Sequence, residues 1–119
     1  LGDMLELGKH TIDAHEEIGR IAAKTVHQLI TIGTRAKFIA EAAQNAGMPK
    51  EKIVSFNELD AAASFLQNII EKGDLVLVKG SQGVRMEKIV KALMRNPEKA
   101  KDLLVRQTKK WLNTPGLYD

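Results

Sequence analysis

Residues Asp74–Leu93, DLVLVKGSQGVRMEKIVKAL, show most clearly how strand-like apolar runs alternate with segments of helical spacing along the chain. Four apolar residues, Leu75–Val78, lead into Lys-Gly-Ser-Gln-Gly, and a charged segment with apolar residues at helical spacing follows. A short apolar run is typical of a buried strand, and a spacing of three and four residues is typical of a helix. The stretch therefore predicts a strand over residues 74–78, a glycine-containing turn and a helix behind it.

The same alternation occurs twice upstream. The runs QLITIG and KIVSF predict strands near 28–32 and 52–56. Amphipathic segments predict helices over about 11–25, 34–46 and 57–72, with a last helix over 96–112. The first of these helices has an expected apolar stripe of Ile12, Ile18, Ile21, Ala22 and Thr25. Strands that alternate with helices indicate an α/β, three-layer domain with a mostly parallel sheet covered on both faces.

Composition restricts the function classes. The chain has 119 residues, 44% of them hydrophobic, which suits one globular domain with one core. No apolar run approaches the roughly 18 residues that a membrane span needs. Cysteine is absent, which excludes disulfides and thiolate metal sites and fits a reducing cytoplasm. The net charge of +3 suits anionic small molecules but is far below that of a dedicated nucleic-acid binder.

The first residues, Leu1-Gly2-Asp3, have the character of the end of a strand and the loop that follows it. The strand itself is not in the sequence. We therefore expect the chain to be a fragment of a longer protein, cut within a unit of the fold.

Three polar loops follow expected strands: GDMLELG, Gly33-Thr34-Arg35 and KGSQGVR (Lys79–Arg85). In open parallel sheets, ligands bind outside the carboxyl ends of the strands. In the last loop, Gly80 and Gly83 allow close backbone approach, and the helix behind them offers unpaired N–H groups. With the positive charges of Lys79 and Arg85, this pattern favours a bound carboxylate or phosphate. An ordinary strand-to-helix turn explains the same glycines about as well.

Other candidate residues are less informative. Asp3 could bind a metal ion, a hydroxyl or an ammonium group, or it could simply form a turn. His15 could point at the Asp3 loop, or it could be a capping or solvated histidine. His10 and His15 do not share a helix face, so a metal site is not expected. The basic residues of the expected last helix are interpreted as a solvated face.

Four segments together resemble the C-terminal domain of the Mur ligases. They are LGDMLELG (1–8), HEEIGRIAA (15–23), LITIGTRAKFIAEAA (29–43) and LVLVKGSQGVRMEKIVKAL (75–93), in the family's order. The first and last are similar to those of the member that joins D-Ala-D-Ala to UDP-N-acetylmuramoyl-tripeptide. The family usually has Arg where this chain has Gln82, and Arg85 could replace that charge. The resemblance covers about residues 1–94 of a domain expected to span 1–119, with 95–119 as an appended helix and tail.

The resemblance implies a Rossmann-like domain that lacks its first strand–helix unit and belongs to a three-domain, cytoplasmic enzyme of peptidoglycan synthesis. ATP and Mg²⁺ would be bound mainly by the central domain, which this chain lacks. The expected partners are D-Ala-D-Ala, UDP-N-acetylmuramoyl-tripeptide and that central domain, with no nucleic acid and no membrane. The chain alone is expected to be inactive, with no catalytic residue and no metal ligand. The resemblance implies substrate contacts from Asp3, Lys79, Gly80, Ser81 and Arg85, supported by His15, Gln82 and Gly83.

Two other classes of protein fit the sequence. A stand-alone α/β module that binds a nucleotide or another anion without catalysis would share the alternating pattern. An adaptor for nucleic acid or a membrane surface would use the basic residues of the last helix, and its binding would fall steeply with salt.

Overall fold

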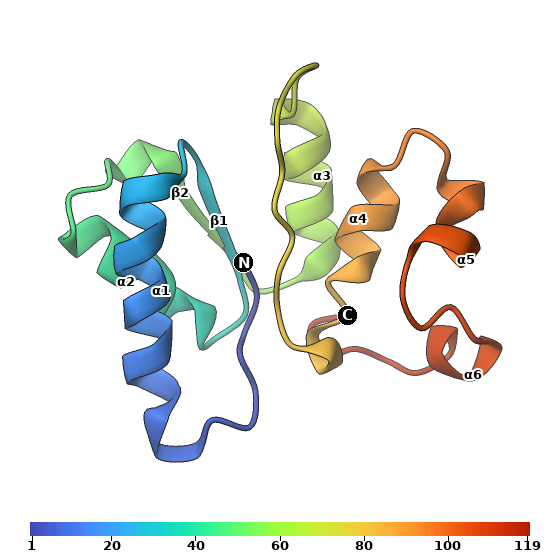
Figure 1. Ribbon diagram of the computed structural model, residues 1–119, viewed down its shortest axis with the longest axis horizontal. Coiled ribbons are helices and arrows are strands. Elements are labelled where there is room, and N and C mark those ends of the chain that lie inside the picture. The colour runs from blue at the N-terminus through green and yellow to red at the C-terminus, as the bar shows by residue number, and fades with distance from the viewer.

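The computed structural model describes residues 1–119 as three layers, with a small parallel sheet between two pairs of helices. The sheet consists of β1 (Leu29–Ile32) and β2 (Ile53–Phe56), whose register runs from Leu29 opposite Ile53 to Ile32 opposite Phe56. Helices α1 (Thr11–Thr25) and α2 (Ala36–Asn45) lie on one side (Figure 1). Helices α3 (Leu59–Ile69) and α4 (Glu87–Leu93) lie on the other.

Shorter elements complete the chain. They are the 3₁₀ turns η1 (Gly8–His10), η2 (Lys50–Lys52), η3 (Gln82–Val84) and η4 (Pro97–Lys99), and the short helices α5 (Ala100–Leu103) and α6 (Lys109–Leu112). No helix has both the length and the apolar character that a membrane crossing would need.

Each face of the sheet has its own apolar core, because successive strand residues point to opposite faces. On one face, Leu29 packs with residues of α1 and α2 (Ala22, Ala36, Ile39 and Ala43) and with Met48. On the other, Ile32 packs with Met86, the residue before α4, and with residues of α3, η3 and α4, namely Leu59, Ala62, Leu66, Val84 and Ile89. These two clusters confirm the predicted α/β architecture with helices on both faces.

The first residues of the chain extend the sheet beyond β1. Gly2 forms a parallel bridge with Ile32, and the Ile32 amide donates to the Leu1 carbonyl at 2.9 Å. The Leu1 amine donates to the Ile30 carbonyl at 2.6 Å. Burial lowers the pKa of this amine from its ordinary value of 8.0 to about 6. Residues 1–3 therefore occupy the place of a further parallel strand, as the sequence predicted.

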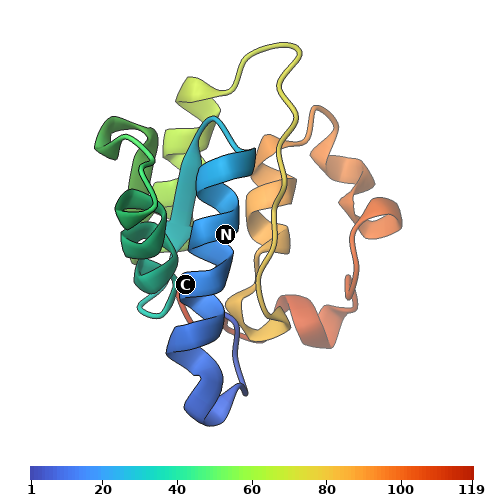
Figure 2. The same ribbon diagram turned by 60° about the vertical axis from the view of Figure 1, so that its left-hand side comes forward.

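The prediction of a strand over 74–78 is wrong. These residues are extended but form no strand (Figure 2). The Leu75 side chain is fully exposed. Backbone pairing begins only later, where Gly2 donates to the Lys79 carbonyl at 2.7 Å and Ser81 donates to the Asp3 carbonyl at 2.9 Å. Residues 75–78 make no backbone hydrogen bond to a neighbouring segment, so no ladder forms there.

Two helix predictions also need correction. The buried face of α1 is His15, Gly19 and Ala22, whereas Ile12 and Ile21 are about half exposed. A Cβ at Gly19 would lie 2.3 Å from the Ile39 carbonyl oxygen, so α1 and α2 approach each other closely at this glycine. That close approach, rather than the isoleucine stripe, sets which side of α1 faces inward.

The expected last helix over 96–112 is broken into η4, α5 and α6. Leu104 is extended, and Arg106 has a positive φ of 53°, which interrupts the helix between α5 and α6. Only Ala100 is buried in this segment, and Leu103 is 67% exposed. A continuous helix would have no apolar surface to cover, and packing usually supplies most of a helix's stability.

Candidate functional site

The three polar loops predicted from the sequence meet at the carboxyl edge of the sheet. The amide of Leu5 donates to the Ser81 hydroxyl at 2.8 Å, which joins the first loop to the third. The amide of Ala36, at the start of α2, donates to Asp3 Oδ1 at 2.6 Å, which joins the first loop to the second. The parallel direction of the chain segments places these loop ends together, as the general rule for open parallel sheets predicts.

Asp3 lies at the centre of this edge and is completely buried. Its Oδ2 accepts a hydrogen bond from the Tyr118 hydroxyl at 2.5 Å and lies 3.7 Å from Arg35 Nη1. Its Oδ1 bonds the first amide of α2, where a negative charge also interacts favourably with the helix dipole. Asp3 therefore has defined partners on both oxygens, which neither a free turn former nor a solvated carboxylate would have.

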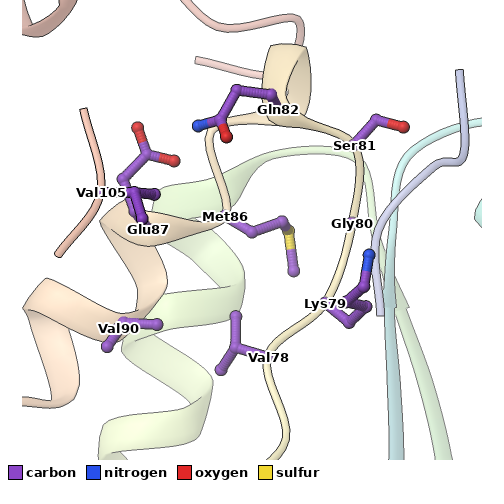
Figure 3. A pocket seen from close by; sticks show the side chains of 9 residues that line it. All are labelled: Val78, Lys79, Gly80, Ser81, Gln82, Met86, Glu87, Val90 and Val105. Carbon is purple, nitrogen blue, oxygen red and sulfur yellow. The ribbon is translucent and has the colours of Figure 1, made fainter.

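The third loop borders an open pocket with a volume of about 160 Å³ (Figure 3). Its lining residues are Val78, Lys79, Gly80, Ser81, Gln82, Met86, Glu87, Val90 and Val105. Figure 3 shows the Met86 side chain pointing into the pocket and the Ser81 hydroxyl turned away from it. Lys79 is exposed and makes no ion pair, so its ammonium group is available to an anionic ligand.

Steric contacts explain why glycine occupies two positions at this edge of the sheet. A Cβ at Gly80 would lie 2.8 Å from Met86 Cγ and 3.2 Å from Gly2 Cα. Gly33 has a φ of +113°, and a Cβ there would lie 2.6 Å from Asp3 Oδ1. Both positions thus require glycine for the packing of neighbouring loops. Gly83 is exposed, and its carbonyl accepts from the Leu117 amide at 3.0 Å.

His15 is completely buried and points at the Asp3 loop. Its Nε2 lies 3.0 Å from the amide nitrogen of Met4, and its Nδ1 lies 2.6 Å from the Thr11 carbonyl oxygen. An N–H donor at Met4 requires an acceptor, so the matching tautomer is neutral with its proton on Nδ1. His15 therefore holds the backbone that follows Asp3, and it does not reach the pocket.

Arg85 lies away from the pocket, buried under the C-terminal segment. It has a positive φ of 65°, and its Nε donates to Glu87 Oε1 at 2.5 Å. Its guanidinium also donates to the Thr114 carbonyl and lies over the Trp111 ring at 4.6 Å. Burial alone would raise the pKa of Glu87, but hydrogen bonds from Arg85 and Trp111 hold it below its ordinary value of 4.5. The contact of Arg85 with substrate stays a prediction.

No sequence pattern indicated a role for Tyr118, the only tyrosine of the chain. Its hydroxyl donates to Asp3 and accepts from the Thr34 amide at 3.1 Å, so the end of the chain reaches the centre of the site. The last residues show no apolar periodicity, and the contact spans 115 positions of sequence. Only a tertiary structure could reveal it.

Residues 1–82 match the family described as Mur ligase, glutamate ligase domain. The chain belongs to this family. It is 36% identical over 98 residues to UDP-N-acetylmuramoyl-tripeptide–D-alanyl-D-alanine ligase of Bacillus subtilis, which covers 82% of the chain and 21% of the relative. It is 31% identical over 109 residues to the ligase of the same name from Mycobacterium bovis, covering 79% of the chain and 21% of the relative.

The chain thus spans about a fifth of the length of these curated relatives. A third ligase of the same name, from Buchnera aphidicola, is 29% identical over 103 residues, covering 82% of the chain and 21% of that relative. No solved structure matches the chain. The family assignment confirms the resemblance that the sequence motifs indicated.

Proposed function

We propose that the chain is the C-terminal, substrate-binding domain of an ATP-dependent ligase that adds D-Ala-D-Ala to UDP-N-acetylmuramoyl-tripeptide during peptidoglycan synthesis in the cytoplasm. The observation that carries this proposal is the junction of the Asp3 loop with Lys79–Ser81 inside the residues that match the family. The names of the relatives supply the two substrates.

The proposed task of this domain is to position the dipeptide. D-Ala-D-Ala carries an ammonium group at one end and a carboxylate at the other, and the site offers both matching charges. Asp3 can attract the ammonium group, and Lys79 can attract the carboxylate. The ammonium group must then lose a proton, and the resulting amine would attack the carbonyl carbon of the tripeptide's acyl phosphate, so that the C–N bond forms as the C–O bond to the departing phosphate breaks. Holding both reactants in that geometry lowers the entropic part of the barrier.

ATP and Mg²⁺ would activate the tripeptide carboxylate by phosphorylation when they are bound. No three histidine or acidic side chains come together as a metal-binding group, and Lys79 is the only cationic residue that lines the pocket. We therefore assign the binding of ATP and Mg²⁺ to other domains of the proposed full-length enzyme.

Titration with D-Ala-D-Ala, followed by NMR, tests the dipeptide site. We expect millimolar or weaker binding, because the site is open to water and each charge contact there contributes about 1 kcal/mol or less. Chemical-shift changes should cluster at residues 3–6 and 79–85. Lys79→Ala should remove them, whereas Lys91→Ala, an exposed lysine of α4, should not. Equal shifts with L-Ala-L-Ala, or binding of phosphate but not dipeptide, would favour a general anion-binding module.

A second test uses the full-length enzyme of the proposal. Lys79→Ala should lower its turnover at sub-saturating D-Ala-D-Ala by about a hundredfold, because losing the charge contact to the bound carboxylate in a closed site that excludes water costs about 3 kcal/mol. The free energy of unfolding should change by less than about 0.5 kcal/mol, since the side chain is exposed. Unchanged turnover would mean that the Lys79 loop is only a turn.

A further inference from the structure

The last six residues, Thr114–Asp119, form a C-terminal tail that lies across the candidate site. The Leu117 amide donates to the Gly83 carbonyl at 3.0 Å, and the Leu59 amide, at the start of α3, donates to the Tyr118 carbonyl at 3.1 Å. Arg85 donates to the Thr114 carbonyl. The tail therefore bridges the Lys79–Arg85 loop and the beginning of α3.

Within this tail, the Tyr118 side chain takes the space next to Asp3. Its hydroxyl donates to Asp3 Oδ2 at 2.5 Å, and both the amide and the hydroxyl of Thr34 lie 3.1 Å from its oxygen. The ring lies so close to Gly33 that a Cβ there would be 2.7 Å from Tyr118 Cε2. A ligand that approaches Asp3 from this side meets the tyrosine ring first.

The next residue, Asp119, adds a carboxylate. It forms an ion pair with Lys88 of α4, and its Oδ2 accepts from the Gly116 amide at 2.6 Å. Two adjacent residues of the tail thus present a hydrogen-bond donor to Asp3 and a carboxylate to a lysine. A dipeptide carries the same two kinds of group, an ammonium donor and a carboxylate, although its carboxylate is assigned above to Lys79 and that of Asp119 pairs with Lys88.

The attachment of the tail is mostly polar. Asp119 is exposed and Leu117 is 52% exposed, so Tyr118 is the only tail side chain that packs against an apolar core. A few net hydrogen bonds of about 1 kcal/mol each, opposed by the entropy of ordering the tail, give a weakly held segment. Release of such a segment requires no unfolding of the sheet.

We propose that the C-terminal tail is an intramolecular competitor of the ligand, which must leave Asp3 before a small molecule with an ammonium or hydroxyl donor and a carboxylate can bind there. The identity of that ligand as D-Ala-D-Ala rests on the function proposed above. The opening of the tail does not depend on that identity.

Amide hydrogen exchange of the whole chain without ligand tests the opening. We expect the amides of Leu59 and Leu117 to exchange at least about a hundredfold faster than that of Ile32, after correction for intrinsic rates, because local opening is far more frequent than global unfolding. Tyr118→Phe removes only the hydroxyl. In this variant the Leu59 and Leu117 amides should exchange about tenfold faster than in the parent chain. Leu103→Ala, an exposed residue of α5, is the control and should leave them unchanged. Exchange of all three amides at the rate of global unfolding would overturn the proposal.

Competition is tested by titrating D-Ala-D-Ala into the parent chain and into Tyr118→Phe. If the tail covers the site for nine-tenths of the time, opening it should raise the apparent affinity about tenfold. Bound dipeptide should also accelerate exchange at Leu59 and Leu117, because it holds the tail away. Equal affinities with unchanged exchange would show that the tail is no competitor. If neither chain binds the dipeptide, the assignment of D-Ala-D-Ala as the ligand is wrong. The opening of the tail is then tested by the hydrogen exchange without ligand alone.

Discussion

At the scale of single residues, one carboxylate connects distant parts of the chain. Asp3 bonds the first amide of α2, 33 positions away, and the hydroxyl of Tyr118, 115 positions away. Hydrogen bonds to an ionised acceptor are worth roughly 1.5–3 kcal/mol each, more than neutral ones. The residue therefore has a structural role in addition to the proposed contact with a ligand.

Asp3→Asn tests that structural role. The amide keeps the shape of the side chain but replaces one acceptor oxygen with a donor, so either Ala36 or Tyr118 loses its partner. We expect the free energy of unfolding to fall by about 1–3 kcal/mol in urea titration. Glu17→Gln makes the same chemical change on the exposed side of α1 and should cost less than about 0.5 kcal/mol. Equal effects of the two substitutions would show that the hydrogen bonds of Asp3 contribute nothing specific.

At the scale of elements, the packing of α1 on α2 depends on the absence of a side chain at Gly19. Gly19→Ala would gain about 1 kcal/mol of helix propensity, but its Cβ would meet the backbone oxygen of Ile39, which cannot rotate away. We expect a net loss of about 1–3 kcal/mol in the free energy of unfolding.

The control for this substitution is Glu17→Ala, two positions earlier and exposed on the same helix. Its effect on thermal unfolding should be close to zero. A stabilised Gly19→Ala variant would mean that the two helices separate easily, and the close contact would then not explain which face of α1 is buried.

The sequence predicted the strands and helices whose periodicity is strong and local. β1, β2 and α1–α4 lie close to their expected positions, because apolar runs and glycine stops act over a few residues. The strand over 74–78 failed because a strand requires a neighbouring backbone, which no local pattern reveals. Ile18 and Ala22 of the predicted α1 stripe pack against the core, whereas Ile12 and Ile21 are half exposed, because the close contact at Gly19 turns another side of the helix inward.

Some features of the candidate site could also be predicted from the sequence, and others could not. The three loops could be predicted, because parallel strands bring their carboxyl ends to one edge. The burial of Arg85 and the arrival of Tyr118 could not, because both depend on the path of residues 95–119. That path lacks a continuous helix and makes its contacts through single hydrogen bonds.

At the scale of the whole molecule, folding of a chain that begins at Leu1 is coupled to pH through its terminal amine. The Leu1 amine lies beside β1 and donates to the Ile30 carbonyl at 2.6 Å. Burial lowers its pKa from 8.0 to about 6 in the folded state. Between these two values, the unfolded chain binds more protons than the folded one, so the free energy of unfolding must rise with pH.

The size of this effect follows from the two pKa values. A difference of two units corresponds to about 2–3 kcal/mol at most, gained as the pH rises from 6 to 8 and constant outside that window. Urea titrations at several pH values should show this rise in a chain that begins at Leu1. Acetylation of the amine keeps an N–H donor for Ile30 but removes the titration, so the rise should disappear. An equal rise in the acetylated chain would assign the pH dependence to other groups and would leave the buried amine without an energetic role.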